Sequence, residues 1–105
     1  MDSVYTIEIR IKIPEGEIPI GNFFLGYDFN TAINTFNSLV GERESQRQTL
    51  SLYLLEKSNS QSEAMDYLNC TLGQLQHNCK IITRDAFRTF SIDGGLKRNT
   101  KMIDR

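Results

Sequence analysis

The stretch Val4-Tyr5-Thr6-Ile7-Glu8-Ile9-Arg10-Ile11-Lys12-Ile13 decides how the rest of the chain is interpreted. Its isoleucines fall on every second position, and charged residues occupy most of the positions between them. Side chains of a β-strand alternate between the two faces of a sheet, whereas a helix would scatter these isoleucines around its axis. The stretch therefore predicts a half-buried strand over residues 4–13, with its isoleucine face toward the core.

A hairpin is expected to follow this strand. Pro14-Glu15-Gly16-Glu17 is typical of a turn, because proline presets φ and glycine tolerates a positive φ. The return strand is expected over residues 18–27, where Phe24 faces away from Phe23 and Leu25. Since Pro19 cannot donate a ladder hydrogen bond, this strand is placed at an edge of the sheet, and the strand of residues 4–13 becomes central.

A helix is predicted to begin at Asp28, whose side chain can accept hydrogen bonds from the amides of the first turn. Gly41 is expected to end it as a left-handed cap. Residues 42–48 contain no apolar side chain and are expected to form a solvated loop. The apolar residues at helical spacing are Ala32, Ile33, Phe36, Leu39 and Val40.

The third strand is expected over residues 49–57, where apolar side chains occupy both faces. A helix between the second and third strands acts as a crossover, and the first strand fits between them. The prediction is an α+β fold with a small antiparallel or mixed three-stranded sheet in the order 2-1-3, and with the helix covering the isoleucine face.

Residues 58–93 permit two interpretations. A spacing of three and four residues between apolar positions is typical of one long helix. Two capping boxes, Ser60-x-x-Glu63 and Thr71-x-x-Gln74, instead favour several short helices. We predict short helices over 62–68, 72–78 and 84–90, with 79–82 extended. The apolar positions are Met65, Leu68, Leu72, Leu75, Cys79 and Ile82.

Length and composition predict one small domain over residues 1–93 and a polar, basic, flexible tail over residues 94–105. The chain has 105 residues, of which 39% are apolar and 24% charged, as in ordinary globular proteins. No segment approaches the roughly 20 apolar residues of a membrane span, and the amino terminus lacks the features of a signal peptide. We therefore predict a cytoplasmic protein with two reduced cysteines and no membrane association.

Charge is distributed unevenly along the chain. Residues 1–79 carry five cations and ten acids, whereas residues 80–105 carry seven cations and three acids. A basic end on an acidic body indicates either a polyanion partner or internal charge complementarity. The candidate phosphate contacts lie in the tail at Lys97, Arg98, Lys101 and Arg105.

Several short motifs together resemble an uncharacterised family of small bacterial proteins. They are Phe23-Phe24-Leu25-Gly26, Ala32, Phe36, Gly41, Cys70-Thr71-Leu72, Asn78, Ile81-Ile82-Thr83 and Phe87. The resemblance covers roughly residues 20 to 92 and implies a bacterial cytosolic α+β protein. It implies no activity.

Cys70, His77 and Cys79 are the thiol and imidazole groups of the chain, and they raise the question of a metal or thiol site. Structural zinc usually needs four ligands, and the chain has no fourth cysteine or histidine. A Cys-His pair would also need an oxyanion hole, and no motif supplies one. A phosphate-binding loop is not indicated either, because Gly94-Gly95 lacks the required glycine spacing. We expect no cofactor and no catalytic activity.

The leading functional hypothesis is a protein-interaction module that binds itself as a homodimer or binds another protein. Alternation along the strands turns Val4, Phe24, Tyr53 and Leu55 away from the isoleucine face, where they would form an apolar patch. The alternative hypothesis is a nucleic-acid-associated accessory protein that uses the basic tail.

Overall fold

The central strand is the one that the alternating stretch predicts. The computed structural model describes residues 3–44 and 49–94, with side chains described up to Phe90. Strand β1 (Val4–Ile13) pairs antiparallel with β2 (Gly16–Gly26) on one side and with β3 (Leu50–Ser58) on the other. Ile7 is fully buried and Ile9 is 8% exposed, which confirms the predicted core face.

Strand β2 lies at an edge of the sheet, as its proline predicts. Pro19 lies opposite Arg10, next to a register shift between Ile9 and Arg10, so the ladder is irregular near the start of this strand. Leu25 is buried in the core, and Phe24 pairs with Thr6 on the opposite face. The predicted alternation therefore holds at the end of β2.

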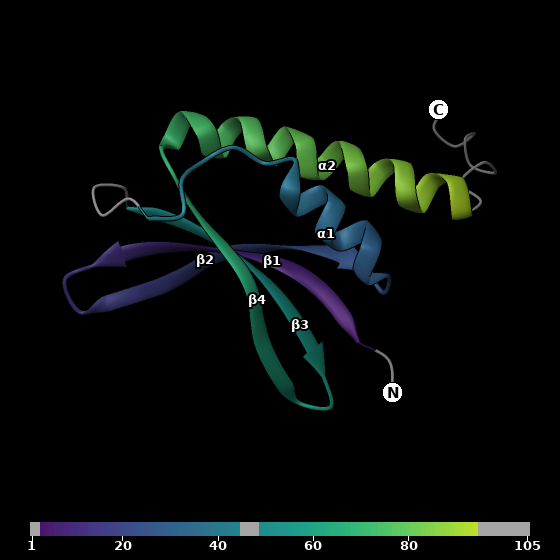
Figure 1. Cartoon of the computed structure of the whole chain (residues 1–105), viewed down its shortest axis with the longest axis horizontal. Helices are drawn as coiled ribbons and strands as arrows, with labels where there is room; N and C mark the ends of the chain where they lie inside the picture. The colour runs from purple at the N-terminus through teal and green to yellow at the C-terminus, as the bar shows by residue number, and fades with distance from the viewer. Residues whose placement is uncertain (1–2, 45–48, 95–105) are drawn as a thin grey trace, which may run out of the picture.

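The sheet has a fourth strand, so the prediction of three strands is wrong. Strand β4 (Gln61–Cys70) pairs antiparallel with β3, and the order is β2-β1-β3-β4 (Figure 1). Asn59 and Ser60 join β3 to β4 with φ values of 50° and 74°. Two successive residues with positive φ form the tight turn that favours hairpins. The Ser60-x-x-Glu63 pattern therefore belongs to a hairpin, and the helix predicted over 62–68 does not form.

Helix α1 (Phe29–Asn37) begins as predicted, with Asp28 as its N-cap. The Asp28 carboxylate accepts hydrogen bonds from the Thr31 amide at 2.9 Å and the Thr31 hydroxyl at 2.7 Å, and these hydrogen bonds lower the pKa of Asp28. The helix ends with Ser38 as its C-cap, so the prediction that Gly41 caps the helix is wrong.

Gly41 instead allows the backbone of the segment after α1 to lie close to β4. A Cβ atom at this position would overlap the carbonyl oxygen of Asn69 and would lie 2.9 Å from the Leu68 side chain. The next residue, Glu42, pairs with Asn69 through two backbone hydrogen bonds of 2.7 and 2.8 Å. The segment after α1 is thereby attached to the free edge of β4.

Helix α2 (Leu72–Gly94) is a single helix, so the predicted division into short helices and an extended piece over 79–82 is wrong. Its beginning was predicted correctly as a capping box. The Gln74 amide donates to the Thr71 hydroxyl at 3.1 Å, and the Thr71 amide donates to the Gln74 side chain at 3.0 Å. Asn78, a weak helix former, is retained within the helix because its buried amide bonds to the Val40 backbone.

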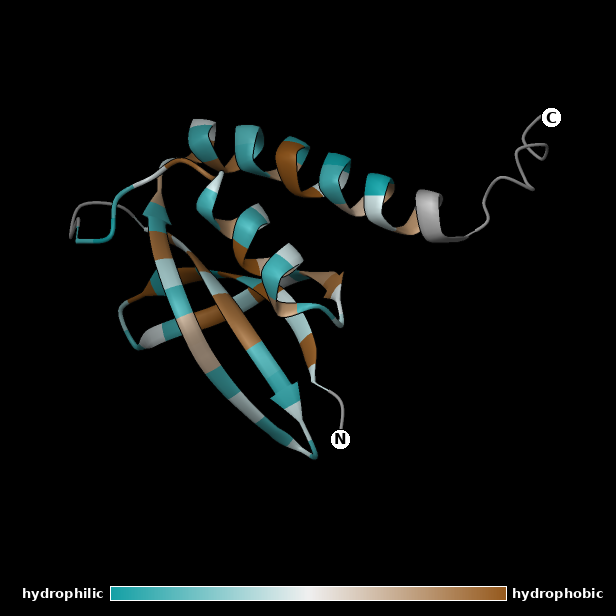
Figure 2. Cartoon of the chain, turned by 45° about the vertical axis from the view of Figure 1, so that its right-hand side comes forward, coloured by the Kyte–Doolittle hydropathy of each residue, from teal (hydrophilic) through white to brown (hydrophobic). Residues whose placement is uncertain are grey.

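Both helices lie on the isoleucine face of the sheet (Figure 1). The hydropathy colouring in Figure 2 shows apolar residues on the strands beneath the helices and a mostly hydrophilic surface along α2. No helix among residues 3–44 and 49–94 is long and apolar enough to cross a membrane. The core cluster comprises Tyr5, Ile7, Ile9, Leu25, Ala32, Phe36, Leu50, Leu52, Leu54, Leu68, Cys70 and Ile82.

Substitutions on β1 test the burial of its two faces. Ile9→Ala is expected to lower the free energy of unfolding by about 2 to 5 kcal/mol, because it leaves a cavity in the core. Arg10→Ala is expected to cost about 1 kcal/mol, because it removes two partly exposed ion pairs and a cation–π contact. Denaturant unfolding measures both values, and a larger loss for Arg10→Ala would show that the core lies on the other face.

Glycine substitutions test the approach of the 38–42 segment to β4. Gly41→Ala is expected to destabilise the protein by about 1 kcal/mol or more, since its Cβ atom has no room beside Asn69. Gly21→Ala is the matched control, because its Cβ atom would meet only the tip of Ile9 at 3.9 Å. Equal thermal stability of the two variants would contradict the close approach.

Candidate functional site

The candidate site is the outer face of the sheet, defined as the face opposite α1 and α2. Strand alternation places Thr6, Glu8 and Arg10 of β1 on this face. Neither helix covers it in the part of the chain that the structure describes (Figure 1). Antiparallel sheets commonly pack one face on the core and leave the other accessible.

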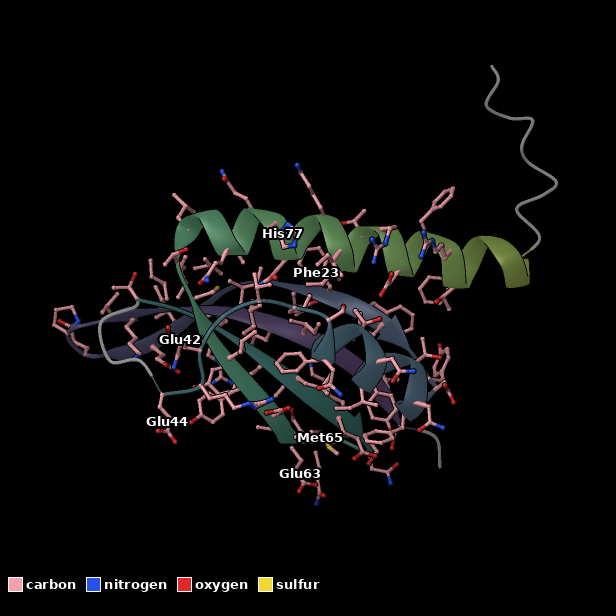
Figure 3. The ribbon with its side chains drawn as sticks, turned by 45° about the horizontal axis from the view of Figure 1, so that its top comes forward. Phe23, Glu42, Glu44, Glu63, Met65 and His77 are labelled. Carbon is pink, nitrogen blue, oxygen red and sulfur yellow. The ribbon has the colours of Figure 1, made fainter. Side chains whose placement is uncertain are left out.

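A row of side chains that is apolar except for the buried Thr6, here called the apolar row, crosses all four strands on the outer face. Cross-strand pairing aligns Phe24 with Thr6, Thr6 with Leu55, and Leu55 with Ala64. Leu55 is only 4% exposed although no helix covers it, so the side chains around it shield it. The accessible ends of the row are Phe24 on β2 and Ala64 on β4, beside the bulged residue Met65. Figure 3 shows Met65 on the side of the sheet away from α2.

A tyrosine pair forms the next row of the outer face. Tyr53 of β3 lies opposite Tyr67 of β4, and their ring centroids are 6.1 Å apart in a stacked arrangement. The guanidinium of Arg10 lies 4.0 Å from the centre of the Tyr53 ring, a cation–π contact. The Tyr53 hydroxyl donates a hydrogen bond to Glu17 at 3.1 Å. Burial and the Glu17 carboxylate raise the pKa of Tyr53, so its hydroxyl stays protonated at neutral pH.

Arg10, on the outer face, has two acidic neighbours, at 3.5 Å from Glu8 and 3.6 Å from Glu17. Arg43 makes two hydrogen bonds of 3.0 Å to Asp66, which the register sets opposite Leu54 and therefore at the helical side of β4. An open cleft of about 470 Å³ lies beside the tyrosines. Its lining residues are Lys12, Glu17, Arg43, Glu44, Tyr53, Tyr67 and Asn69.

Asn69 connects the outer face to the segment that follows α1. Its side-chain carbonyl accepts a hydrogen bond from the Ser51 hydroxyl at 2.7 Å, and its amide group donates to the Arg43 carbonyl at 3.1 Å. Asn69 is 6% exposed, so these partners satisfy a buried polar side chain. They also hold Arg43 beside the cleft.

An aromatic corner, formed by Phe24, Tyr27 and Phe90, lies where β2 meets α2. The ring of Phe24 stacks on Phe90 with centroids 5.6 Å apart and meets the edge of Tyr27 at 5.5 Å. These rings are 43%, 67% and 40% exposed for Phe24, Tyr27 and Phe90 respectively. The corner was not foreseen, because Phe24 and Phe90 are far apart in the sequence and no local pattern joins them.

The four predicted interface residues occupy different environments on the outer face. Phe24 is accessible, Val4 and Tyr53 are half-buried, and Leu55 is buried. Val4 pairs with Lys57 at the end of the sheet. The predicted polyanion contacts Lys97, Arg98, Lys101 and Arg105 lie outside the described residues.

The candidate thiol and imidazole groups do not share one environment. Cys70 is fully buried in the core, Cys79 packs against that core, and His77 is exposed on α2 (Figure 3). Burial raises the pKa of both thiols, and proximity to Cys79 adds to the effect at Cys70. Protonated thiols are poor nucleophiles at neutral pH. Within the described ranges, no group of three or more His, Cys, Asp or Glu side chains is placed to hold a metal ion.

Comparison of the chain with protein-family models, with curated protein sequences and with solved structures finds no match in any of the three. The predicted resemblance to a bacterial family therefore stays a prediction.

Proposed function

We propose that the protein is a non-enzymatic interaction module that forms a homodimer through the outer face of its sheet. The observation that carries this proposal is the apolar row, which crosses four strands on a face that the helices meet only where Phe90 stacks on Phe24. Face-to-face packing of two sheets is a common way to bury such a surface. The bacterial, cytoplasmic setting that the sequence predicts belongs to the same proposal.

Exposed side chains along this face supply the contacts that a partner would need. Phe24 is 43% exposed, Met65 is 39% exposed and Tyr67 is 41% exposed. Aromatic residues and methionine are enriched at protein interfaces because they offer large contact areas. Leu55 is already buried, so it would pack against the neighbouring side chains of the face and would not contact the partner.

A second copy of the chain fits this face better than a strongly charged partner does. Arg10, the arginine that strand alternation places on this face, already has acidic neighbours at Glu8 and Glu17. Two copies related by a two-fold axis would therefore bring together surfaces on which the charge of Arg10 is already neutralised. A partner of high charge would have to displace these internal pairs.

Strand addition at β2 is the less favourable route to a dimer. Pro19 removes one backbone donor, and register shifts interrupt the ladder beside Pro19 and again at the end of the strand. Such features protect edge strands from pairing with another chain. The proposed dimer therefore uses side chains of the outer face.

Light scattering after size-exclusion chromatography tests the dimer between about 1 and 100 μM, the range in which weak homodimers dissociate. The wild-type chain is expected to have the mass of a dimer at the upper end. Met65→Glu and Phe24→Glu are each expected to weaken the dimer at least about tenfold, because a carboxylate is buried without a partner.

Leu72→Glu is the matched control, since Leu72 is 64% exposed on α2 and lies on the helical side of the molecule. It is expected to leave the dimer unchanged. Phe24→Glu could weaken the dimer indirectly, because Phe24 also stacks on Phe90 within the chain. Met65 is not part of the aromatic corner, so Met65→Glu tests the interface alone. A monomeric wild-type chain throughout this range, or equal loss with Leu72→Glu, would refute the proposed interface.

A further inference from the structure

The solvent-facing side of α2 carries a basic stripe, defined here as Lys80, Arg84 and Arg88. The spacing of four residues places them on one face of the helix, over about 12 Å of its length. All three are exposed, and the Arg84 side chain is 52% exposed. The face lies opposite Asn78 and Ile82, which are fully buried against the rest of the molecule.

A phenylalanine lies within the basic stripe. Phe87 is three residues beyond Arg84 and precedes Arg88, so its ring projects from the same side of the helix. It is 66% exposed, and Phe90, one turn further along, is 40% exposed. Packing inside the chain does not explain the position of a phenylalanine that is two-thirds exposed.

Acidic residues on this part of the helix do not neutralise the whole stripe, because Asp85 is the single acid between Leu72 and Phe90. Its carboxylate accepts a hydrogen bond from the Thr35 hydroxyl at 3.0 Å and lies 3.2 Å from Arg84. Among the side chains that the structure describes, Lys80 and Arg88 make no ion pair, so they add positive charge on either side of the Arg84–Asp85 pair.

We propose that this face of α2 binds single-stranded nucleic acid, which goes beyond the dimer proposed above. Cations on the stripe would contact phosphates, and the exposed ring of Phe87 would stack on a base. A single strand fits better than a duplex, because its bases are free to stack on a side chain. The site lies on the helical side of the molecule, so it remains accessible when the outer face is buried in a dimer.

Fluorescence anisotropy with the full chain and a labelled oligothymidylate of 20 nucleotides tests the site. The logarithm of the association constant is expected to fall with the logarithm of salt concentration with a slope of about −2, for three phosphate contacts. Arg88→Ala is expected to reduce the magnitude of this slope by about 0.7. Phe87→Ala is expected to weaken binding by about 5- to 150-fold through the lost stacking.

Two controls make the assignment specific. Lys12→Ala removes an exposed cation from the outer face, and Leu72→Ala removes an exposed apolar side chain from the same helix. Both are expected to leave the affinity unchanged, and circular dichroism checks that every variant is folded. A duplex of the same length is expected to bind more weakly.

Several outcomes would overturn the assignment. They are no binding at low salt, binding that survives both Phe87→Ala and Arg88→Ala, equal affinity for the duplex, and equally effective competition by polyglutamate. Survival in both variants would place any nucleic-acid contact elsewhere on the chain. Polyglutamate competition would indicate a site for acidic protein segments instead.

Discussion

The side chain of Asn78 makes the contact on which the arrangement of the two helices depends. It is fully buried within α2, where its amide donates to the Val40 carbonyl and its carbonyl accepts from the Val40 amide, both at 2.9 Å. A buried amide without these partners would destabilise the fold by about 1 to 3 kcal/mol. Since Val40 follows α1, the two hydrogen bonds join α2 to the end of α1.

The same segment is also joined to the sheet. Glu42 pairs with Asn69 through the backbone, and Gly41 allows the approach because it carries no Cβ atom. Both helices are thus held on the isoleucine face, where Ala32, Phe36 and Ile82 complete the core. On the outer face, Glu8 and Glu17 neutralise Arg10, and the apolar row is met by a helix only where Phe90 stacks on Phe24. Its accessibility is therefore a consequence of how the helices are held.

Local patterns predicted those parts of the fold that local chemistry decides. Alternation identified β1, Pro19 placed β2 at an edge, and Asp28 and Thr71 marked the beginnings of the two helices. Strand β4 was missed because Asn59 and Ser60 adopt positive φ values, which are rare for residues other than glycine. Apolar residues of β4 and α2 happened to share a helical spacing across the boundary between the strand and the helix.

The candidate site was predictable only in part, for a related reason. Alternation correctly turned Phe24 and Tyr53 away from the isoleucine face. It gave no indication that Leu55 would be shielded or that Arg10 would cover the Tyr53 ring, since both depend on neighbours in other strands. The aromatic corner likewise joins residues from opposite ends of the chain. Contacts between distant segments depend on the register of the sheet, which local sequence patterns do not predict.

The most direct test of an interface on the outer face is an isotope-filtered NOE experiment on a mixture of labelled and unlabelled chains. Nuclei of the labelled chain then report only on contacts with the unlabelled copy. Intermolecular NOEs are expected from the Met65 methyl group to aromatic protons of Phe24 or Tyr67 in the second copy. Intermolecular NOEs from the exposed side of α2, such as Leu72, without any from Met65 would contradict this account.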